Sequence, residues 1–187
     1  MILVLGGARS GKSSYAEESV KKHIAQEGGD VLYVATSIAF DEDMQDRVKK
    51  HQEARPSHWH TLEQYKGFNT LEEHPDFQKS KVVMLDCVTL MVSNLLLDYP
   101  VDFDHIPRHE IDQMEGLITK EVKDFVTACQ KHHKHLILVS NEVGLGIVPA
   151  YRLGSIFRDI AGRMNQLLAR EADEVYFLVS GIPMKIK

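Results

Sequence analysis

A loop near the N-terminus has the residue types and spacing that bind a nucleoside triphosphate. Residues 6–13 read Gly-Gly-Ala-Arg-Ser-Gly-Lys-Ser and fit the pattern G-x-x-x-x-G-K-[ST], with an apolar run before them and a helical pattern after them. Such glycines let the backbone turn tightly and direct N–H groups at phosphate oxygens, and the helix N-terminus adds partial positive charge. A plain glycine turn between a strand and a helix is the alternative. The predicted nucleotide contacts are Gly6, Gly7, Ala8, Arg9, Ser10, Gly11, Lys12 and Ser13.

Two side chains of this loop have specific expected roles. Lys12 is predicted to be catalytic, because its ammonium would reach the β- and γ-phosphates. The Ser13 hydroxyl is predicted to ligate Mg²⁺.

Asp86 is a candidate for the acidic group that such a loop needs beside it. It follows four apolar residues that predict a buried strand, and Mg²⁺ bound to phosphates favours a carboxylate, directly or through water. A strand-end aspartate can equally cap the helix that follows it. Asp86 is therefore predicted to be a metal and nucleotide residue, with helix capping as the alternative.

His51 is a candidate nucleophile. It lies on a polar helix predicted over residues 41–53, where most histidines are solvated surface residues. However, this helix follows the second predicted strand, and Arg55, one turn on, is suited to pair with phosphate. A neutral imidazole beside a bound triphosphate can attack phosphorus and form a covalent phosphoramidate. The residues alone leave both interpretations open.

Other polar residues follow predicted strands. Thr36 and Ser37 end the second strand, and ligands of open α/β sheets bind beyond the carboxyl ends of strands, so both are expected to face the nucleotide. Glu142 follows a later strand and either positions a nucleophile, contacts Mg²⁺ or caps the backbone amides of its loop. Arg158, Asp159 and Arg163 have the spacing of ordinary ion pairs on one helix.

Alternation of apolar runs and helical patterns predicts the fold. Strands and helices alternate along the whole chain, which is typical of an α/β domain with a mostly parallel sheet and helices on both faces. No internal boundary is apparent, so residues 1–187 are expected to form a single domain. Strands are predicted at 2–5, 31–35, 59–63, 82–86, 136–140 and 174–179, with a short antiparallel edge strand at 184–187. Helices are predicted at 14–27, 41–53, 87–97, 109–132 and 152–171, with a weakly patterned connector at 71–78.

Composition limits the partners. The formal net charge is −5 over 187 residues and no basic block occurs, which disfavours a nucleic-acid-binding surface. No apolar run approaches the length of a membrane span, and the first strand runs directly into the loop without a signal peptide. Cys87 and Cys129 lie in apolar stretches without metal-ligand spacing. A cytoplasmic protein with no membrane span is expected.

The chain resembles, over its whole length, the bifunctional adenosylcobinamide kinase/adenosylcobinamide-phosphate guanylyltransferases of cobalamin biosynthesis. The phosphate-binding loop alone is generic. The specific features are His51 with Arg55-Pro56 and Trp59, and the segment Asn-Glu-Val-Gly-Leu-Gly-Ile-Val-Pro at residues 141–149. Residues 33–37, 157–163 and 179–182 also follow the family's pattern.

The resemblance implies a three-layer, RecA-like P-loop NTPase fold, a homo-oligomer (a trimer) and GTP and ATP as co-substrates with Mg²⁺. It implies phosphorylation of adenosylcobinamide, and then transfer of GMP from GTP to adenosylcobinamide phosphate through a guanylylated His51, which yields adenosylcobinamide-GDP and pyrophosphate. Some members have two adjacent histidines where this chain has Lys50-His51, and some have Glu where it has Asp86. The further nucleotide contacts that the resemblance implies are Ala35, Thr36, Ser37, Gln52, Glu53, Ala54, Arg55, Glu63 and Asp86.

Three alternative functions are weighed against this one. A plain small-molecule kinase would share the loop but lack the covalent step. A GTP-dependent switch would carry an Asn-Lys-x-Asp motif, which the sequence does not contain. A RecA-like ATPase acting on nucleic acid is disfavoured by the acidic charge balance.

Overall fold

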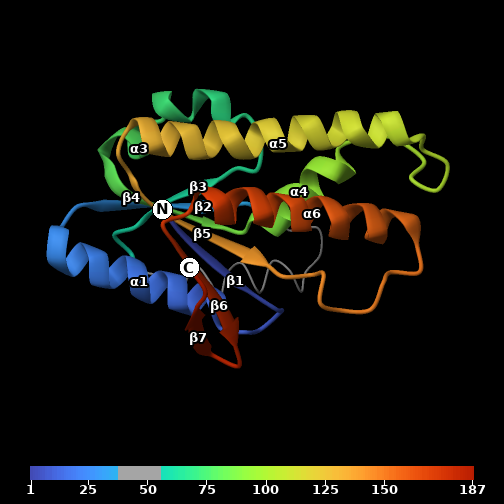
Figure 1. Cartoon of the computed structure of the whole chain (residues 1–187). Helices are drawn as coiled ribbons and strands as arrows, with labels where there is room; N and C mark the ends of the chain where they lie inside the picture. Colours follow the sequence, from blue (N-terminus) through green and yellow to red (C-terminus); the bar gives the residue numbers. More distant parts are fainter. Residues whose placement is uncertain (38–55) are drawn as a thin grey trace.

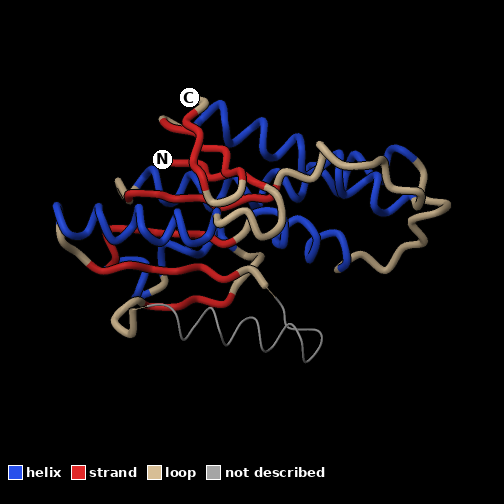
Figure 2. The backbone as a smooth tube through the Cα atoms, turned by 90° about the horizontal axis from the view of Figure 1, so that it is seen from below, coloured by secondary structure: helices blue, strands red, loops and turns tan. Residues whose placement is uncertain are grey.

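The described residues form a seven-stranded sheet with helices packed on its two faces (Figures 1 and 2). The computed structural model describes residues 1–37 and 56–187. Their elements are β1 (Ile2–Gly6), α1 (Lys12–Glu27), β2 (Asp30–Ala35), β3 (His60–Glu63), the 3₁₀ helix η1 (Phe68–Glu73), α3 (Pro75–Lys79), β4 (Ser80–Asp86), α4 (Val88–Leu97), α5 (Arg108–Lys131), β5 (His135–Asn141), α6 (Arg152–Glu171), β6 (Glu174–Val179) and β7 (Ile182–Lys185).

The strand order is β3-β2-β4-β5-β1-β6-β7. Every neighbouring pair is parallel except the β6–β7 hairpin at the C-terminal edge. This confirms the predicted α/β fold, with a mostly parallel sheet and a short antiparallel edge strand, and it agrees with a P-loop NTPase architecture.

Side-chain alternation along the strands assigns each helix to a face of the sheet. In β4, Val82 and Met84 point to the face where Ala16 and Val20 of α1 pack. Val83 and Leu85 point to the opposite face, in one apolar cluster with α4, α5 and α6. Figure 1 shows α1 on one side of the sheet and these three helices on the other. Because both faces are covered, the central strands are continuous apolar runs rather than alternating ones.

The structure corrects several predicted details. The predicted connector at 71–78 overlaps η1 and α3, because Phe68, Leu71 and Phe77 bury their side chains in the core. The turn into the edge strand lies at Ser180 and Gly181, both at positive φ, so β7 begins at Ile182. The apolar side chains of α5 that face the core are buried, whereas Leu117 is 54% exposed.

The remaining predicted elements are confirmed to within a few residues, except the helix at 41–53, which lies outside the described residues. Within the described part of the chain, no helix is both long and apolar enough to cross a membrane.

Candidate nucleotide-binding site

The phosphate-binding loop joins β1 to α1, as its pattern predicts. Gly11 caps α1 in the left-handed conformation, at φ 89°, and Arg9 is also left-handed, at φ 56°. A Cβ added to Gly6 would lie 2.4 Å from the Ser10 hydroxyl and 2.9 Å from the carbonyl oxygen of Leu178. Glycine is therefore required at position 6, and the chain reverses tightly enough to turn its amides toward one point.

This loop lines an open cavity of about 560 Å³. Residues 8–14 form one side of the cavity, and Leu90 of α4 also lines it. The Ser10 side chain is 7% exposed, and its hydroxyl has no hydrogen-bond partner among the described residues. The loop thus places Ser10 and Lys12 along a cavity that can accept a phosphate group.

Lys12 lies inside this site. Its side chain is 9% exposed, and its ammonium donates a hydrogen bond to the carbonyl oxygen of Gly7 at 3.1 Å. The cation is thus held over the loop by the loop's own backbone, within reach of a phosphate bound there. Ser13, the next residue of α1, is half-buried.

The C-terminal hairpin supports the loop from outside the motif. The amide of Gly181, in the β6–β7 turn, donates to the carbonyl oxygen of Ser10 at 2.9 Å. A Cβ added to Gly11 would lie 3.3 Å from the Cα of Gly181, so the two backbones nearly touch. The match of residues 179–182 to the family pattern was one signal for this contact, but it offered no physical reason for the contact.

Asp86 ends β4 and does not cap the next helix. Cys87 is the N-cap residue of α4, and no side chain provides a capping hydrogen bond there. The Asp86 carboxylate instead accepts a hydrogen bond from the Tyr33 hydroxyl at 3.1 Å. The carboxylate therefore points to the sheet face that α1 covers, and the helix-capping alternative does not hold.

Cys87, next to Asp86, carries a buried thiol. Burial raises the pKa of the Cys87 thiol to about 11, the Asp86 carboxylate acts in the same direction, and the Lys12 ammonium opposes it. The thiol is therefore protonated at neutral pH.

Three predicted contact residues meet at the carboxyl ends of neighbouring strands. Ala35 of β2 pairs with Glu63 of β3 on one side and with Asp86 of β4 on the other. The structure therefore brings Ala35, Glu63 and Asp86 to one edge of the sheet, the edge where β1 enters the loop.

Thr36 has a structural role at this edge. It is buried, and its hydroxyl donates to the carbonyl oxygen of Cys87 at 2.7 Å and accepts from the Cys87 amide at 2.9 Å. Its own carbonyl oxygen accepts from Asn94 at 2.7 Å. The side chain thus joins β2 to the start of α4, and its expected contact with nucleotide stays a prediction, as does that of half-buried Ser37.

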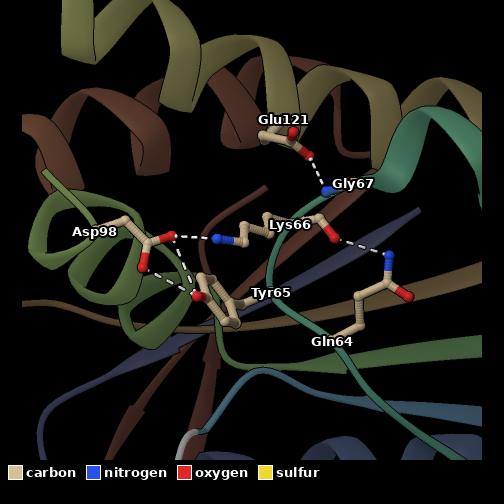
Figure 3. A network of polar contacts seen from close by, with 6 residues as sticks. All are labelled: Gln64, Tyr65, Lys66, Gly67, Asp98 and Glu121. Carbon is tan, nitrogen blue, oxygen red and sulfur yellow. Dashed lines mark hydrogen bonds and ion pairs between the residues drawn. The ribbon is translucent and has the colours of Figure 1, made fainter.

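A polar network fixes the backbone that follows Glu63 (Figure 3). Asp98, at the end of α4, accepts from the Tyr65 hydroxyl at 3.0 Å and from the Lys66 ammonium at 2.8 Å. Glu121 of α5 accepts from the Gly67 amide at 2.9 Å. The loop that carries the chain away from Glu63 is therefore attached to two helices.

Two further expectations concern the role of Glu142 and the ion pairs of α6. Glu142 accepts from the Gly144 amide at 2.6 Å, so it caps its loop as one alternative proposed. Arg158 pairs with Asp159 at 3.1 Å, but Arg163 pairs across helices with Glu115 of α5, at 2.8 Å, rather than along α6. This pair raises the pKa of the Arg163 guanidinium through its hydrogen bond to Glu115.

The remaining site residues predicted from the sequence lie outside the described residues. They are the candidate nucleophile His51 and the expected contacts Gln52, Glu53, Ala54 and Arg55.

The fold and the loop together define a P-loop nucleotide-binding α/β protein. Within that class, the family model of cobinamide kinase / cobinamide phosphate guanyltransferase matches residues 2–186. The chain belongs to this family, whose activities are a kinase and a guanylyltransferase of adenosylcobalamin biosynthesis. Membership sets aside the plain kinase, the GTP-dependent switch and the nucleic-acid-dependent ATPase.

Curated relatives match over their full length. The chain is 47% identical over 187 residues to the bifunctional adenosylcobalamin biosynthesis protein CobU of Escherichia coli K12. This alignment covers 100% of this chain and 99% of the relative. It is 44% identical to the CobU protein of Salmonella typhimurium LT2, over 100% of this chain and 99% of the relative. It is 37% identical to the CobP protein of Pseudomonas aeruginosa PAO1, over 99% of this chain and 96% of the relative.

Proposed function

We propose that both activities use one triphosphate-binding site, residues 6–13, which holds a separate nucleoside triphosphate in each reaction and cleaves it at the γ-phosphorus or at the α-phosphorus. The observation that carries this proposal is the cavity along the loop, which Lys12 lines at the same end of the sheet as Asp86. Loss of the γ-phosphoryl group serves the kinase, and loss of pyrophosphate serves the guanylyltransferase.

In the kinase step, a hydroxyl of adenosylcobinamide attacks the γ-phosphorus in line with the leaving β-phosphate. Charge spreads over the phosphoryl oxygens in such a transition state, so catalysis consists mainly of positioning and electrostatic stabilisation. The loop amides and the Lys12 ammonium supply that stabilisation.

In the transferase step, His51 attacks the α-phosphorus of GTP and pyrophosphate leaves. The phosphate of adenosylcobinamide phosphate then displaces the imidazole, which yields adenosylcobinamide-GDP and regenerates the histidine. Imidazole must be neutral to attack, so this step should weaken as pH falls through about 6.5, the ordinary histidine pKa. Gln52–Arg55 and Glu63 are proposed to contact the nucleotide near this reaction.

Ser13 and Asp86 are the residues that would hold Mg²⁺. Bound there, the ion would neutralise charge on the phosphates of the triphosphate. The hydroxyl of Ser13 in the loop and the carboxylate of Asp86 at the sheet edge are hard oxygen donors that suit this ion.

We also propose that the corrinoid acceptor binds between subunits of a homo-oligomer, with a trimer favoured. The described surface offers exposed apolar side chains, including Leu145 and Ile147 after β5 and Ile182 in the hairpin. A macrocycle of this size needs more enclosing surface than one sheet edge provides. Light scattering under assay conditions tests this, because a fully active monomer would refute it.

Equilibrium dialysis tests the shared nucleotide site. The proposal predicts one triphosphate bound per chain, with ATP and GTP excluding each other. Simultaneous binding of both nucleotides to one chain would contradict it.

A further inference from the structure

Asn141 occupies a position at the reacting end of the sheet to which no role has yet been given. It is the last residue of β5, the strand between β1 and β4, and it pairs with Gly6, where the phosphate-binding loop begins. Ile137 and Val139 of β5 pack on the face covered by α1, so alternation turns the Asn141 side chain to that same face. Asn141 thus stands between the loop and the Asp86 strand.

The Asn141 side chain is held in place from the Asp86 side. Its amide nitrogen donates to the Thr89 hydroxyl at 2.6 Å and lies 3.7 Å from the Cys87 sulfur. The backbone amide of Asn141 also donates to the Thr89 hydroxyl, at 3.1 Å. Thr89 is 3% exposed, so this anchor is buried and the amide plane is fixed.

A second support of the Asn141 backbone comes from the opposite face. Asn165 of α6 donates to the Asn141 carbonyl oxygen at 3.0 Å and accepts from the Ser140 hydroxyl at 2.7 Å. Thr89 therefore supports both the side chain and the backbone amide of Asn141, whereas Asn165 supports its backbone carbonyl alone.

One atom of the amide is left for a ligand. Within residues 1–37 and 56–187, no group donates a hydrogen bond to Asn141 Oδ1, and the residue is partly exposed. A carbonyl oxygen cannot favour contact with phosphate oxygens, because both are acceptors. It favours a hydrogen-bond donor. In the kinase step, the substrate hydroxyl that receives the phosphoryl group must approach the γ-phosphate, and it is such a donor.

We propose that Asn141 is a further catalytic residue of the kinase step, whose Oδ1 accepts a hydrogen bond from the attacking hydroxyl of the cobinamide substrate. This proposal rests on the proposed function of the loop. The hydroxyl oxygen forms a bond to the γ-phosphorus, the bond from that phosphorus to the β,γ-bridging oxygen breaks, and the nucleoside diphosphate leaves. The hydroxyl proton passes to an oxygen of the transferred phosphoryl group, since an amide orients the nucleophile but does not take its proton.

The test compares two reactions of the same full-length chain. Kinase turnover is measured with γ-labelled triphosphate and cobinamide, and formation of the protein adduct is measured with α-labelled GTP. Asn141→Ala should lower kinase kcat by about 10- to 100-fold, because one orienting contact is lost. The KM for nucleotide and the adduct yield should change by no more than about 2-fold, because neither involves the acceptor hydroxyl.

Two variants separate this role from a structural one. Thr89→Val keeps the side-chain shape but removes the hydrogen bonds to both the side chain and the backbone amide of Asn141. It should therefore lower Tm and give a smaller loss of kinase kcat than Asn141→Ala, with the adduct yield unchanged. Asn165→Ala removes the backbone support, so it should lower Tm and affect both reactions alike.

Two outcomes would overturn the proposal. Full kinase turnover in Asn141→Ala would show that the amide is not used, and an equal loss of kinase turnover and adduct would make Asn141 a scaffold residue. If the wild-type chain forms no adduct, the covalent step of the proposed function fails instead. Nucleotide affinity from dialysis then replaces the adduct as the second readout, and the prediction for kinase kcat stands unchanged.

Discussion

The amide of Gly181 donates a hydrogen bond to the carbonyl oxygen of Ser10. The hairpin near the C-terminus therefore supports the phosphate-binding loop, which lies near the N-terminus. Gly181 has φ +82°, and a Cβ added there would meet nothing within 4 Å. Any effect of Gly181→Ala therefore comes from the backbone conformation, and it should lower the free energy of unfolding by about 1 kcal/mol.

We expect Gly181→Ala to weaken triphosphate binding as well as stability, because a displaced turn no longer positions the loop. Thermal unfolding with and without GTP measures both effects. Gly116→Ala, in the middle of α5 and likewise unhindered, is the matched control and should leave GTP binding unchanged while raising Tm. A Gly181→Ala protein that loses stability but keeps its full GTP-induced shift in Tm would show that the hairpin does not position the loop.

Lys12→Ala should abolish both activities. The ammonium that lies over the loop is fixed there by the Gly7 carbonyl oxygen, and its loss should reduce each turnover by more than about 100-fold. Lys21→Ala removes an exposed cation from the same helix and should leave both rates unchanged. Loss of one activity with the other intact would indicate separate nucleotide sites.

Asp86→Asn should raise the Mg²⁺ concentration needed for half-maximal activity, since an amide is a weaker ligand for this ion than a carboxylate. Tyr33→Phe removes the hydrogen bond to the same carboxylate without removing its charge, and should change the Mg²⁺ requirement much less. Magnesium titrations of both activities measure this. An unchanged requirement in Asp86→Asn would remove Asp86 from the metal site.

His135 should make the fold sensitive to acid. Burial, the ring of His23 stacked on it at 3.7 Å and the N-terminal ammonium lower the pKa of His135 to about 4. A histidine whose pKa is lower in the folded state contributes stability above its unfolded pKa near 6.5, and that contribution is lost as pH falls toward 4.

His135→Phe keeps a ring against His23 but cannot bind a proton, so it should lose less stability than the wild type between pH 7 and pH 5. Urea unfolding at the two pH values measures the difference. His109→Phe, at an exposed position of α5, should follow the wild-type pH dependence. Equal loss of stability between pH 7 and pH 5 in the wild type and His135→Phe would show that His135 is not the source of the acid sensitivity.

The fold followed from the sequence because its signals are local. Continuous apolar runs such as residues 82–85 predict buried parallel strands, and the spacing of residues 6–13 fixes a strand, a loop and a helix in order. The connector at 71–78 was missed because short helical turns are stabilised by burial of Phe77 and Leu71 rather than by a repeating pattern.

Contacts between distant segments could not be predicted in this way. The support of Ser10 by Gly181 joins residues 171 apart through their backbones, and backbone hydrogen bonds leave no side-chain signal. The pairing of Arg163 with Glu115 instead of Asp159 depends on how α5 and α6 pack, which helical spacing along α6 does not encode. Asn141 was noticed as part of a family segment, but its place between two strands appears only in the sheet order.

Labelling with α-³²P GTP tests the central claim, a guanylylated His51. A phosphorus–nitrogen bond to imidazole is stable in alkali and labile in acid, so the label should stay with the wild-type protein in base and be lost in mild acid. Label from γ-³²P GTP should leave none. His51→Asn should form no adduct and transfer no GMP while largely retaining kinase turnover, and His58→Asn and His60→Asn should label as the wild type does. Retention of label by His51→Asn, or a wild-type chain that never takes up the α-label, would contradict the account.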